Sequence, residues 1–367
     1  MGALTDIGIL GTGVWDAEPV GNERFERFAT AAGAVRDPFK GRRGEDGSIS
    51  IAGLELTKAR YPRTLSAVER AFADPYRGAR RRRILPEDMR VSDAEVSAAR
   101  AAIAGAGLTA ADIDLVLTHS FLPDEFTPKN AARVAYALGI GGAGAWELDS
   151  VCNSALSQLT AGAALISSGI ARHVLCVQSC VYSRVTDPNT ASTVQEADLA
   201  AAYVLGRRPG GQLAFSWRTD GRLHDATLLQ WDAPTGAPKR KYWERAKEQL
   251  LIRFDPELQP QVMGDLQRYA PVVVEEALGR AGMTIDDVDV FISHQPMAWY
   301  PEFIEETLGL RAGAMFHTFE EYANVNSPSL TASLHHALLA GRVAPGTRVL
   351  FFGPAAGYTY GAVALRW

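Results

Sequence analysis

Three residues of this chain could together form a nucleophilic site. Cys152 follows the strand-like run Ala145–Leu148, and the small helix-forming residues after it place its sulfur at the start of a helix. The partial positive charge of a helix start favours the thiolate. His294 ends the apolar run in FISHQPMAWY, and Asn324 precedes an Ala/Leu-rich helix in EEYANVNSPSLTASLHHALLAGR. A thiol, an imidazole and an amide at converging ends of elements suit covalent acyl transfer.

Each of these residues also has a simpler structural interpretation. A free cysteine is commonly a small buried hydrophobe, a histidine at a strand end can be a satisfied structural residue, and an asparagine before a helix is most often an N-cap. Cys176 and Cys180 lie within or just after an apolar run, and we interpret them as packing residues. Local sequence alone therefore leaves the role of the three candidates open.

An internal repeat changes this balance. Residues 102–119 (AIAGAGLTAADIDLVLTH) resemble residues 277–294 (ALGRAGMTIDDVDVFISH), so that His119 is matched to His294. The same offset along the chain aligns 174–177 (VLCV) with 349–352 (VLFF). Two matches in register indicate a duplicated α/β unit.

The repeat also relates the candidate residues to one another. Gly169 matches Gly341 across a sequence separation that is three residues shorter than that of the two matches above, the length of one turn. Across this shorter separation, Cys152 is matched to Asn324. We therefore expect these two residues to begin equivalent helices that converge on a pseudo-twofold axis. His119 ends the first copy of the repeat, so it is either a second candidate or a relic of the duplication.

The duplication predicts an α/β fold of two similar halves, residues 1–208 and 209–367, joined at RRPGG. Helices alternating with buried strands imply largely parallel sheets covered by helices, and two such halves give a five-layered αβαβα sandwich. Stretches of about 35–75 and 222–268 lie outside the repeat and are either substrate lids, partner surfaces or decorations. The predicted helices are Ala94–Ala106 and Val272–Ala281, and the predicted strands are Asp114–Thr118, Val174–Gln178, Val288–Ser293 and Arg348–Phe352.

Composition excludes several classes of protein. The 367 residues are 47% hydrophobic and carry a net charge of −5, which leaves no electrostatic footprint for nucleic acid. Three cysteines in this length exclude a disulfide scaffold and fit a reducing compartment. The start of the chain lacks the features of a signal peptide, and no apolar stretch is long enough to span a bilayer. We expect a cytoplasmic protein with no membrane partner and no metal site.

The closing segment LFFGPAAGYTYGAVALRW reads as a strand, a tight turn of small residues and a return strand. Such a turn leaves backbone N–H groups accessible, as an oxyanion hole requires. A plain hairpin linker is the alternative interpretation.

These motifs, in this order, resemble the thiolase superfamily, and within it the β-ketoacyl-ACP synthase III-like enzymes. The resemblance rests on DIGILGTGVW, the Cys152 helix, FISHQP, YANVNSPS and GYTYGAVALRW. It implies that Cys152 is acylated, that His294 and Asn324 complete a Cys-His-Asn set, and that the backbone N–H groups of Cys152 and Ala356 form the oxyanion hole. It further implies that Phe126 lines the acyl pocket near a dimer contact.

The resemblance also implies partners and substrates. The family forms homodimers through the first-half sheet, binds no cofactor tightly, and takes acyl-CoA or the phosphopantetheine of an acyl carrier protein as substrate. A basic cluster lies where the tunnel mouth of the family would be, and we interpret it as a docking site for a carrier protein or CoA phosphates; a solvated surface is the alternative. The cluster consists of Arg77, Arg80, Arg81, Arg82 and Arg83.

Four departures from the family pattern favour a relative from specialised metabolism. The usual His-Gln-Ala-Asn reads His294-Gln295-Pro296-Met297, Gly-Asp-Gly-Ala reads Ala-Asp-Leu-Ala at 197–200, and a Gly-Gly-Gly turn reads Ala-Ala-Gly at 355–357. An Arg expected after the Asp-Pro turn for the CoA nucleotide is missing from TDPNTASTV.

The leading hypothesis is decarboxylative Claisen condensation with a malonyl-type thioester in polyketide or fatty-acid-like metabolism. The alternatives are acyl transfer to an alcohol, amine or thiol, and a non-catalytic partner subunit.

Overall fold

The computed structural model describes residues 2–32, 41–187, 190–231 and 249–367. Its main sheet has eight strands, seven of them in the order β13-β14-β15-β10-β9-β7-β8, with β1 also paired to β10. These strands are β1 (Leu4–Val14), β7 (Leu115–Ser120), β8 (Gly144–Glu147), β9 (Val174–Val181), β10 (Asp198–Thr219), β13 (Val290–Ser293), β14 (Arg348–Ala355) and β15 (Thr359–Arg366). Each predicted strand corresponds to one of them, with shifted ends.

Strand β10 belongs to both halves of the fold. Its first part, Asp198–Leu205, pairs with β9, and its second part, Gln212–Thr219, pairs with β15. The change of partner falls within residues 206–211, where the sequence suggested the link RRPGG. This link lies inside one long strand rather than in a turn between separate strands, and Gly210 adopts a left-handed φ of 77° there.

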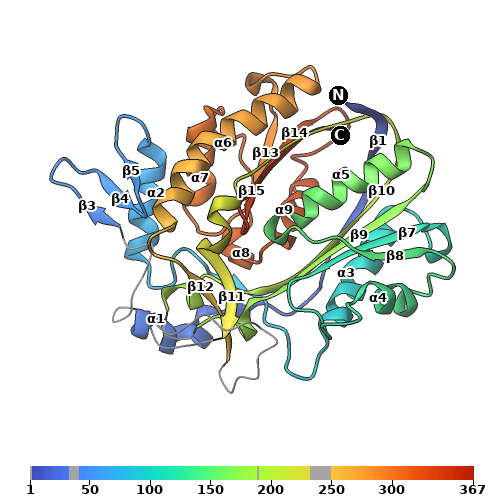
Figure 1. Ribbon diagram of the computed structural model, residues 1–367, viewed down its shortest axis with the longest axis horizontal. Coiled ribbons are helices and arrows are strands. Elements are labelled where there is room, and N and C mark those ends of the chain that lie inside the picture. Colours follow the sequence, from blue (N-terminus) through green and yellow to red (C-terminus); the bar gives the residue numbers. More distant parts are fainter. Residues whose placement is uncertain (1, 33–40, 188–189, 232–248) are drawn as a thin grey trace.

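Helices cover the strands in layers (Figure 1). On the outer face of the first half, α3 (Val91–Gly105) and α4 (Ala131–Leu138) pack on β7, β9 and β10. On the outer face of the second half, α6 (Gln259–Arg280) and α7 (Tyr300–Leu308) pack on β13–β15. Between them lie α5 (Ser154–Ser167) and α9 (Pro328–Leu339), whose apolar side chains share one core with strands of both halves. This is the expected αβαβα layering.

The backbone repeats the duplication seen in the sequence. Thr109 and Asp112 form a capping box at one short 3-10 helix, and Thr284 and Asp287, which the repeat pairs with them, form the same box at another. In such a box the side chain at each end satisfies a backbone N–H group at the other. The two TxxD turns are therefore built by local hydrogen bonds, which is why both copies were visible in the sequence.

The stretches outside the repeat form their own elements. The first contains a small sheet and α2, whose start is hydrogen-bonded to Glu306 of α7 through the backbone and hydroxyl of Thr64. Residues 33–40 of this stretch and residues 232–248 of the second lie outside the described residues. The elements of the two stretches are β3 (Arg42–Arg43), β4 (Ile49–Ile51), β5 (Leu54–Leu56), α2 (Pro62–Ala73), β11 (Thr227–Trp231) and β12 (Leu250–Phe254). Before and after the first stretch lie β2 (Val20–Gly21), α1 (Glu26–Ala32) and β6 (Arg81–Arg82).

Helix α6 is longer than the sequence indicated. It begins at Gln259, with Pro260 in its first turn, whereas the predicted helix began at Val272. Proline is favourable in the first turn because its missing N–H needs no partner there. The helix continues through Pro271, because the packing of its apolar face on β15 outweighs one lost hydrogen bond.

Candidate active site

Cys152 lies in a 3-10 turn, Val151–Asn153, directly before α5. The Asn153 amide anchors this turn to the closing strands, because its Nδ2 donates to the carbonyls of Gly353 and Thr359, each at 2.8 Å. Val151 is held at a left-handed φ of 52°, which is strained for a β-branched residue. The chain therefore makes a sharp, over-determined bend that presents Cys152 toward the end of β14.

Asn324 occupies the equivalent bend of the second half. Ala323, the counterpart of Val151 in the repeat, also has a left-handed φ, of 55°. The N–H of Asn324 donates to Gln195 O at 2.7 Å, and its Oδ1 accepts from the N–H of Asn326 at 3.1 Å. Helix α9 begins further on, at Pro328, so Asn324 is not its N-cap. Oδ1 is engaged and Nδ2 has no partner among the described residues, so the Nδ2 of Asn324 is available as a donor.

The starts of the two central helices contact each other directly. The backbone N–H of Ala155, in the first turn of α5, donates to the Ser327 hydroxyl at 2.7 Å, and Ser327 immediately precedes α9. A residue of the first half is thereby tied to its own counterpart in the second. The structure thus brings the segments of Cys152 and Asn324 together at the pseudo-twofold, as the repeat predicted.

His294 directly follows β13 and is only 3% exposed. Its N–H donates to Phe352 O of β14 at 3.0 Å, and its Nδ1 lies 3.2 Å from the hydroxyl of Ser329 in α9. Burial lowers the pKa of His294 to about 4, although the backbone of Asn326 acts in the opposite direction. The imidazole is therefore neutral at physiological pH, with one nitrogen able to donate a hydrogen bond and the other able to accept one.

The thiol of Cys152 differs from the sequence-based expectation. Burial raises its pKa to about 12, while the backbone N–H groups of Ala356 and Cys152 and the hydroxyl of Tyr182 act in the opposite direction. The expectation that the helix start alone would favour the thiolate is therefore wrong, because desolvation of the buried sulfur outweighs the dipole. The N–H groups of Ala356 and Cys152, which the resemblance assigned to the oxyanion hole, both lie at this sulfur.

Tyr182 was not identified from the sequence. It follows β9 directly and is 7% exposed, and its hydroxyl accepts a hydrogen bond from the Nδ2 of Asn326 at 2.9 Å. Because Asn326 supplies the donor in that bond, the hydrogen of the Tyr182 hydroxyl is free to point at the Cys152 sulfur. The sequence feature that could have identified Tyr182 is its position at the carboxyl end of a buried strand, where functional groups of α/β folds commonly lie.

His119, the counterpart of His294, supports the bend before Cys152. It is 1% exposed, and its Nδ1 lies 3.1 Å from the Oδ1 of Asp149. That same carboxylate accepts from the N–H of Val151 at 2.8 Å. Although burial raises the pKa of Asp149, the contacts with His119 and the Val151 N–H lower it well below its usual range. His119 thus contacts the turn ahead of the nucleophile.

Phe126 is 68% exposed at the surface of the single chain, and its place at an acyl pocket near a dimer contact stays a prediction. One other expectation needs correction. Arg82 is fully buried, because its guanidinium lies 4.2 Å from the ring centre of Phe25 and donates to Val194 O and the side chain of Asn22. Arg82 therefore cannot contribute to a docking surface.

The remaining arginines of the cluster lie nearer the surface. Arg80 and Arg81 are exposed and form ion pairs of 3.1 and 3.4 Å with Glu320 and Glu321. These glutamates belong to α8 (Phe319–Tyr322), which directly precedes the bend of Asn324. Arg83 stacks on Tyr322 of α8, and Arg77 stacks on Phe72. Four members of the cluster thus stay near the surface, and three of them, Arg80, Arg81 and Arg83, contact α8 beside the candidate site.

Cys176 and Cys180 are buried, free thiols of β9, and burial raises the pKa of each. Within the described ranges, no group of three or more His, Cys, Asp or Glu residues could hold a metal ion. None of the helices described is long and apolar enough to cross a membrane.

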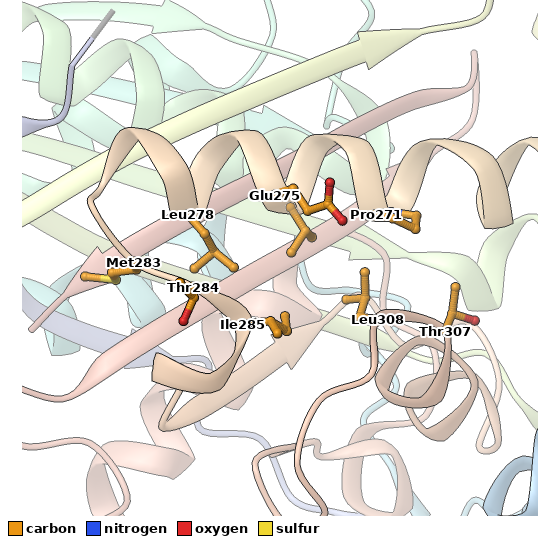
Figure 2. Close-up of a pocket in the computed structure, with 9 residues that line it drawn as sticks. Pro271, Glu275, Leu278, Met283, Thr284, Ile285, Thr307 and Leu308 are labelled. Atoms are coloured by element: carbon orange, nitrogen blue, oxygen red, sulfur yellow. The ribbon is translucent and has the colours of Figure 1, made fainter.

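A surface pocket of about 360 Å³ lies away from these residues, between α6, the turn after it and the end of α7 (Figure 2). Its position on the outer layer separates it from the central helices that carry Cys152 and Asn324. It is lined by Pro271, Val274, Glu275, Leu278, Met283, Thr284, Ile285, Thr307 and Leu308. We therefore do not assign it to the candidate active site.

Comparison with solved structures identifies the class of fold. The chain superimposes on 3-oxoacyl-[acyl-carrier-protein] synthase III from Aquifex aeolicus with a TM-score of 0.75 at 23% identity, covering 98% of this chain and 100% of that one. The priming β-ketosynthase of the R1128 polyketide pathway gives a TM-score of 0.77 at 23% identity, covering 100% of this chain and 98% of that one. The fold is therefore thiolase-like.

Sequence comparison narrows the class to a family. The family model "3-Oxoacyl-[acyl-carrier-protein (ACP)] synthase III" matches residues 146–221, and the model of its C-terminal part matches residues 278–367. β-Ketoacyl-[acyl-carrier-protein] synthase III of Rhizorhabdus wittichii is 31% identical over 79% of this chain and 88% of its own length. Synthase III 3 of Streptomyces coelicolor is 30% identical over 85% of this chain and 93% of its own.

This chain belongs to the β-ketoacyl-ACP synthase III family of the thiolase superfamily. It is a synthase III-like acyltransferase of the condensing type, and the family uses acyl-CoA or acyl-carrier-protein thioesters.

Proposed function

We propose that the chain carries an acyl group on Cys152 and condenses it with a malonyl-type thioester, in polyketide or fatty-acid-like specialised metabolism. The observation that supports this most strongly is the convergence of the segments carrying Cys152, His294 and Asn324. Asn326 links these segments, because its backbone contacts His294 and the Oδ1 of Asn324, and its side chain contacts Tyr182. Tyr182 in turn contacts the sulfur of Cys152.

In the loading step, the Cys152 sulfur attacks the carbonyl carbon of an acyl thioester. The new C–S bond forms, the old C–S bond breaks, and the thiol proton of Cys152 leaves with the departing thiol. The N–H groups of Cys152 and Ala356 stabilise the oxygen that becomes negative in the tetrahedral intermediate. Removal of one such donor typically reduces the rate on the order of 100- to 1000-fold.

In the condensing step, a malonyl-type thioester loses carbon dioxide and leaves an enolate. The neutral imidazole of His294 and the free Nδ2 of Asn324 donate to the enolate oxygen, and the enolate carbon attacks the carbonyl carbon held by Cys152. The bond to the sulfur of Cys152 then breaks and the free thiol is restored on protonation. A neutral histidine suits this role because it brings a donor without a full buried charge.

A second candidate function is transfer of the acyl group to an alcohol, amine or thiol. The altered segment after His294 favours it. Gln295 is fully buried, donating to Ala323 O at 3.3 Å and accepting from the N–H of Thr318 at 3.0 Å, and Met297 is also buried. These residues position the bend of Asn324 but offer no exposed amide to a pantetheine arm.

Intact-protein mass spectrometry with a panel of acyl-CoA and acyl-carrier thioesters tests the proposal. We expect a mass gain that is lost in Cys152→Ala, and carbon dioxide release when a malonyl thioester is added. His294→Ala should reduce decarboxylation far more than loading. Loading without carbon dioxide release would support the second candidate, and no loading by any donor would indicate a non-catalytic subunit.

We also propose a homodimer, formed through the free edge of the first half. Strand β8 ends the sheet and carries Trp146, which is 50% exposed, and Tyr136 of the adjacent α4 and Phe126 are more exposed still. Trp146→Glu should shift the mass measured by light scattering from dimer to monomer. Ile170→Glu is the matched control, since Ile170 is an exposed apolar residue beyond the end of α5. A Trp146→Glu dimer would refute this interface.

For carrier-protein docking we propose the exposed part of the basic cluster, Arg80 and Arg81 with Arg77 and Arg83 beside them. Arg80→Glu combined with Arg81→Glu should weaken loading from an acidic carrier protein. Arg311→Glu is the control, because Arg311 is as exposed as Arg81 and also paired to a carboxylate, but lies beyond α7. Unchanged loading in the double variant would refute the docking site.

A further inference from the structure

A buried carboxyl group lies beside the candidate site and has no part in the condensation described above. Glu196 is 7% exposed and forms an isolated bridge with Asn324. The residues on either side of it hold this bridge, because Gln195 O accepts from the Asn324 N–H and the Ala197 N–H donates to Asn324 O. Glu196 is therefore positioned by the same loop that positions Asn324.

One carboxyl oxygen of Glu196 has a partner and the other does not. Oε2 is hydrogen-bonded to the Thr186 hydroxyl, which also donates to Tyr182 O at 2.8 Å. The Thr186 hydroxyl has only one hydrogen for these two acceptors, so a proton on Glu196 supplies the second hydrogen that the two bonds require. Burial raises the pKa of Glu196 to about 7. Within the described part of the chain, Oε1 forms no hydrogen bond, and it is not among the fully enclosed unpaired atoms, so it keeps some accessible surface.

Tyr182 connects Glu196 to the nucleophile. Its hydroxyl contacts the Cys152 sulfur, and negative charge on either Cys152 or Glu196 disfavours the ionised form of Tyr182, which places the tyrosine close to both. The ring of Tyr182 has apolar neighbours, with Phe121 at 5.1 Å between ring centres and residues of the β11–β12 hairpin packed on the same cluster. We take an acyl chain on Cys152 to extend past Tyr182 into this apolar cluster, within reach of Oε1 of Glu196.

We propose that Oε1 of Glu196 accepts a hydrogen bond from a hydroxyl or amino group on the acyl chain carried by Cys152, so that the enzyme selects polar-substituted acyl thioesters over plain alkyl ones. The inference rests on the proposed acylation of Cys152. A single acceptor beside an apolar cluster discriminates strongly, because an alkyl chain that covers the oxygen leaves it unpaired. Glu196 is on this view a specificity-determining residue.

The test is the rate of Cys152 loading, followed by intact mass, with butyryl-CoA and 3-hydroxybutyryl-CoA as a matched pair. We expect the wild type to load the hydroxy compound at least tenfold faster. Glu196→Leu should abolish this preference while still loading butyryl-CoA. Glu196→Gln should keep the preference, because the glutamine carbonyl can replace Oε1 while its amide donates to Thr186. Glu95→Gln changes another buried carboxyl, bonded to Ser120, Ser179 and Asn130 and not to Thr186 or Asn324, and should not alter the ratio.

Equal loading of the two thioesters by the wild type, or an unchanged ratio in Glu196→Leu, would overturn the inference and leave the proposed function intact. If Glu196→Leu does not fold, the wild-type ratio and Glu196→Gln still decide. Absence of any mass gain at Cys152 with either acyl group, offered on CoA and on an acyl carrier protein, would overturn the proposed function, and this inference with it.

Discussion

The neutral state of His294 has a consequence for stability that can be measured without a substrate. The pKa of its imidazole falls from an ordinary value of 6.5 to about 4 in the folded protein because the ring is buried. Between these two values the unfolded chain binds a proton that the folded chain does not. A depressed histidine pKa therefore makes stability fall as the pH is lowered from 7 toward 4.

The magnitude follows from the two pKa values. At pH 7 the imidazole is mostly neutral in both states, so its contribution is close to zero. At pH 5 it is protonated in the unfolded chain and neutral in the folded one, which lowers the free energy of unfolding by about 2 kcal/mol. The full span of the shift corresponds to about 3 kcal/mol, which is reached below pH 4.

Urea denaturation of the wild type and of His294→Asn at pH 7, 6 and 5 measures this effect. The substitution also changes packing, but that cost does not depend on pH and appears as a constant offset. The buried carboxyl groups and the other histidines are common to both proteins and cancel in the difference. We expect the wild type to lose about 2 kcal/mol relative to the variant between pH 7 and pH 5. A difference that stays constant over this range would refute the neutral, buried state of His294.

Three further predictions concern the nucleophile and the core. Tyr182→Phe removes a donor to the Cys152 sulfur and should slow acylation by about fivefold, equivalent to about 1 kcal/mol; a rate within twofold of wild type would contradict the contact. Leu159→Ala opens a cavity in the core shared by both halves and should cost about 2–5 kcal/mol by urea denaturation, whereas a cost under about 1 kcal/mol would mean that the site collapses freely. Gly11→Ala places a Cβ against the backbone of Ala102 and Ala106 at the end of α3 and should lower stability by about 1–3 kcal/mol; an unchanged melting temperature would contradict this close approach.

Much of the architecture could be predicted because its signals are local. The TxxD turns are built by hydrogen bonds within a single turn of chain, and the strands that follow them are short apolar runs, so both copies of the repeat stood out. Length and repeat together predicted the layered fold, and the register of the repeat predicted that Cys152 and Asn324 begin equivalent segments. The long strand β10 was not foreseen, since glycines and a proline at its centre are typical of a turn.

Features that depend on distant partners could not be predicted in this way. Arg82 belongs to a run of four arginines that has the pattern of a surface patch, because arginine is rarely buried. Its burial depends on the ring of Phe25 and the carbonyl of Val194, which are both far from it in the sequence. Tyr182 and Glu196 likewise gained their roles only through contacts with Asn326 and Asn324 in the other half.

Residue types and their spacings along the chain were sufficient to identify the family, the repeat and a candidate nucleophile. The electrostatics around that nucleophile, in contrast, depend on contacts that only folding creates. The helix start that should favour a thiolate is buried, and desolvation raises the pKa of Cys152 to about 12 instead. Desolvation depends on which segments cover a group, and around Cys152 these segments come from both halves of the chain.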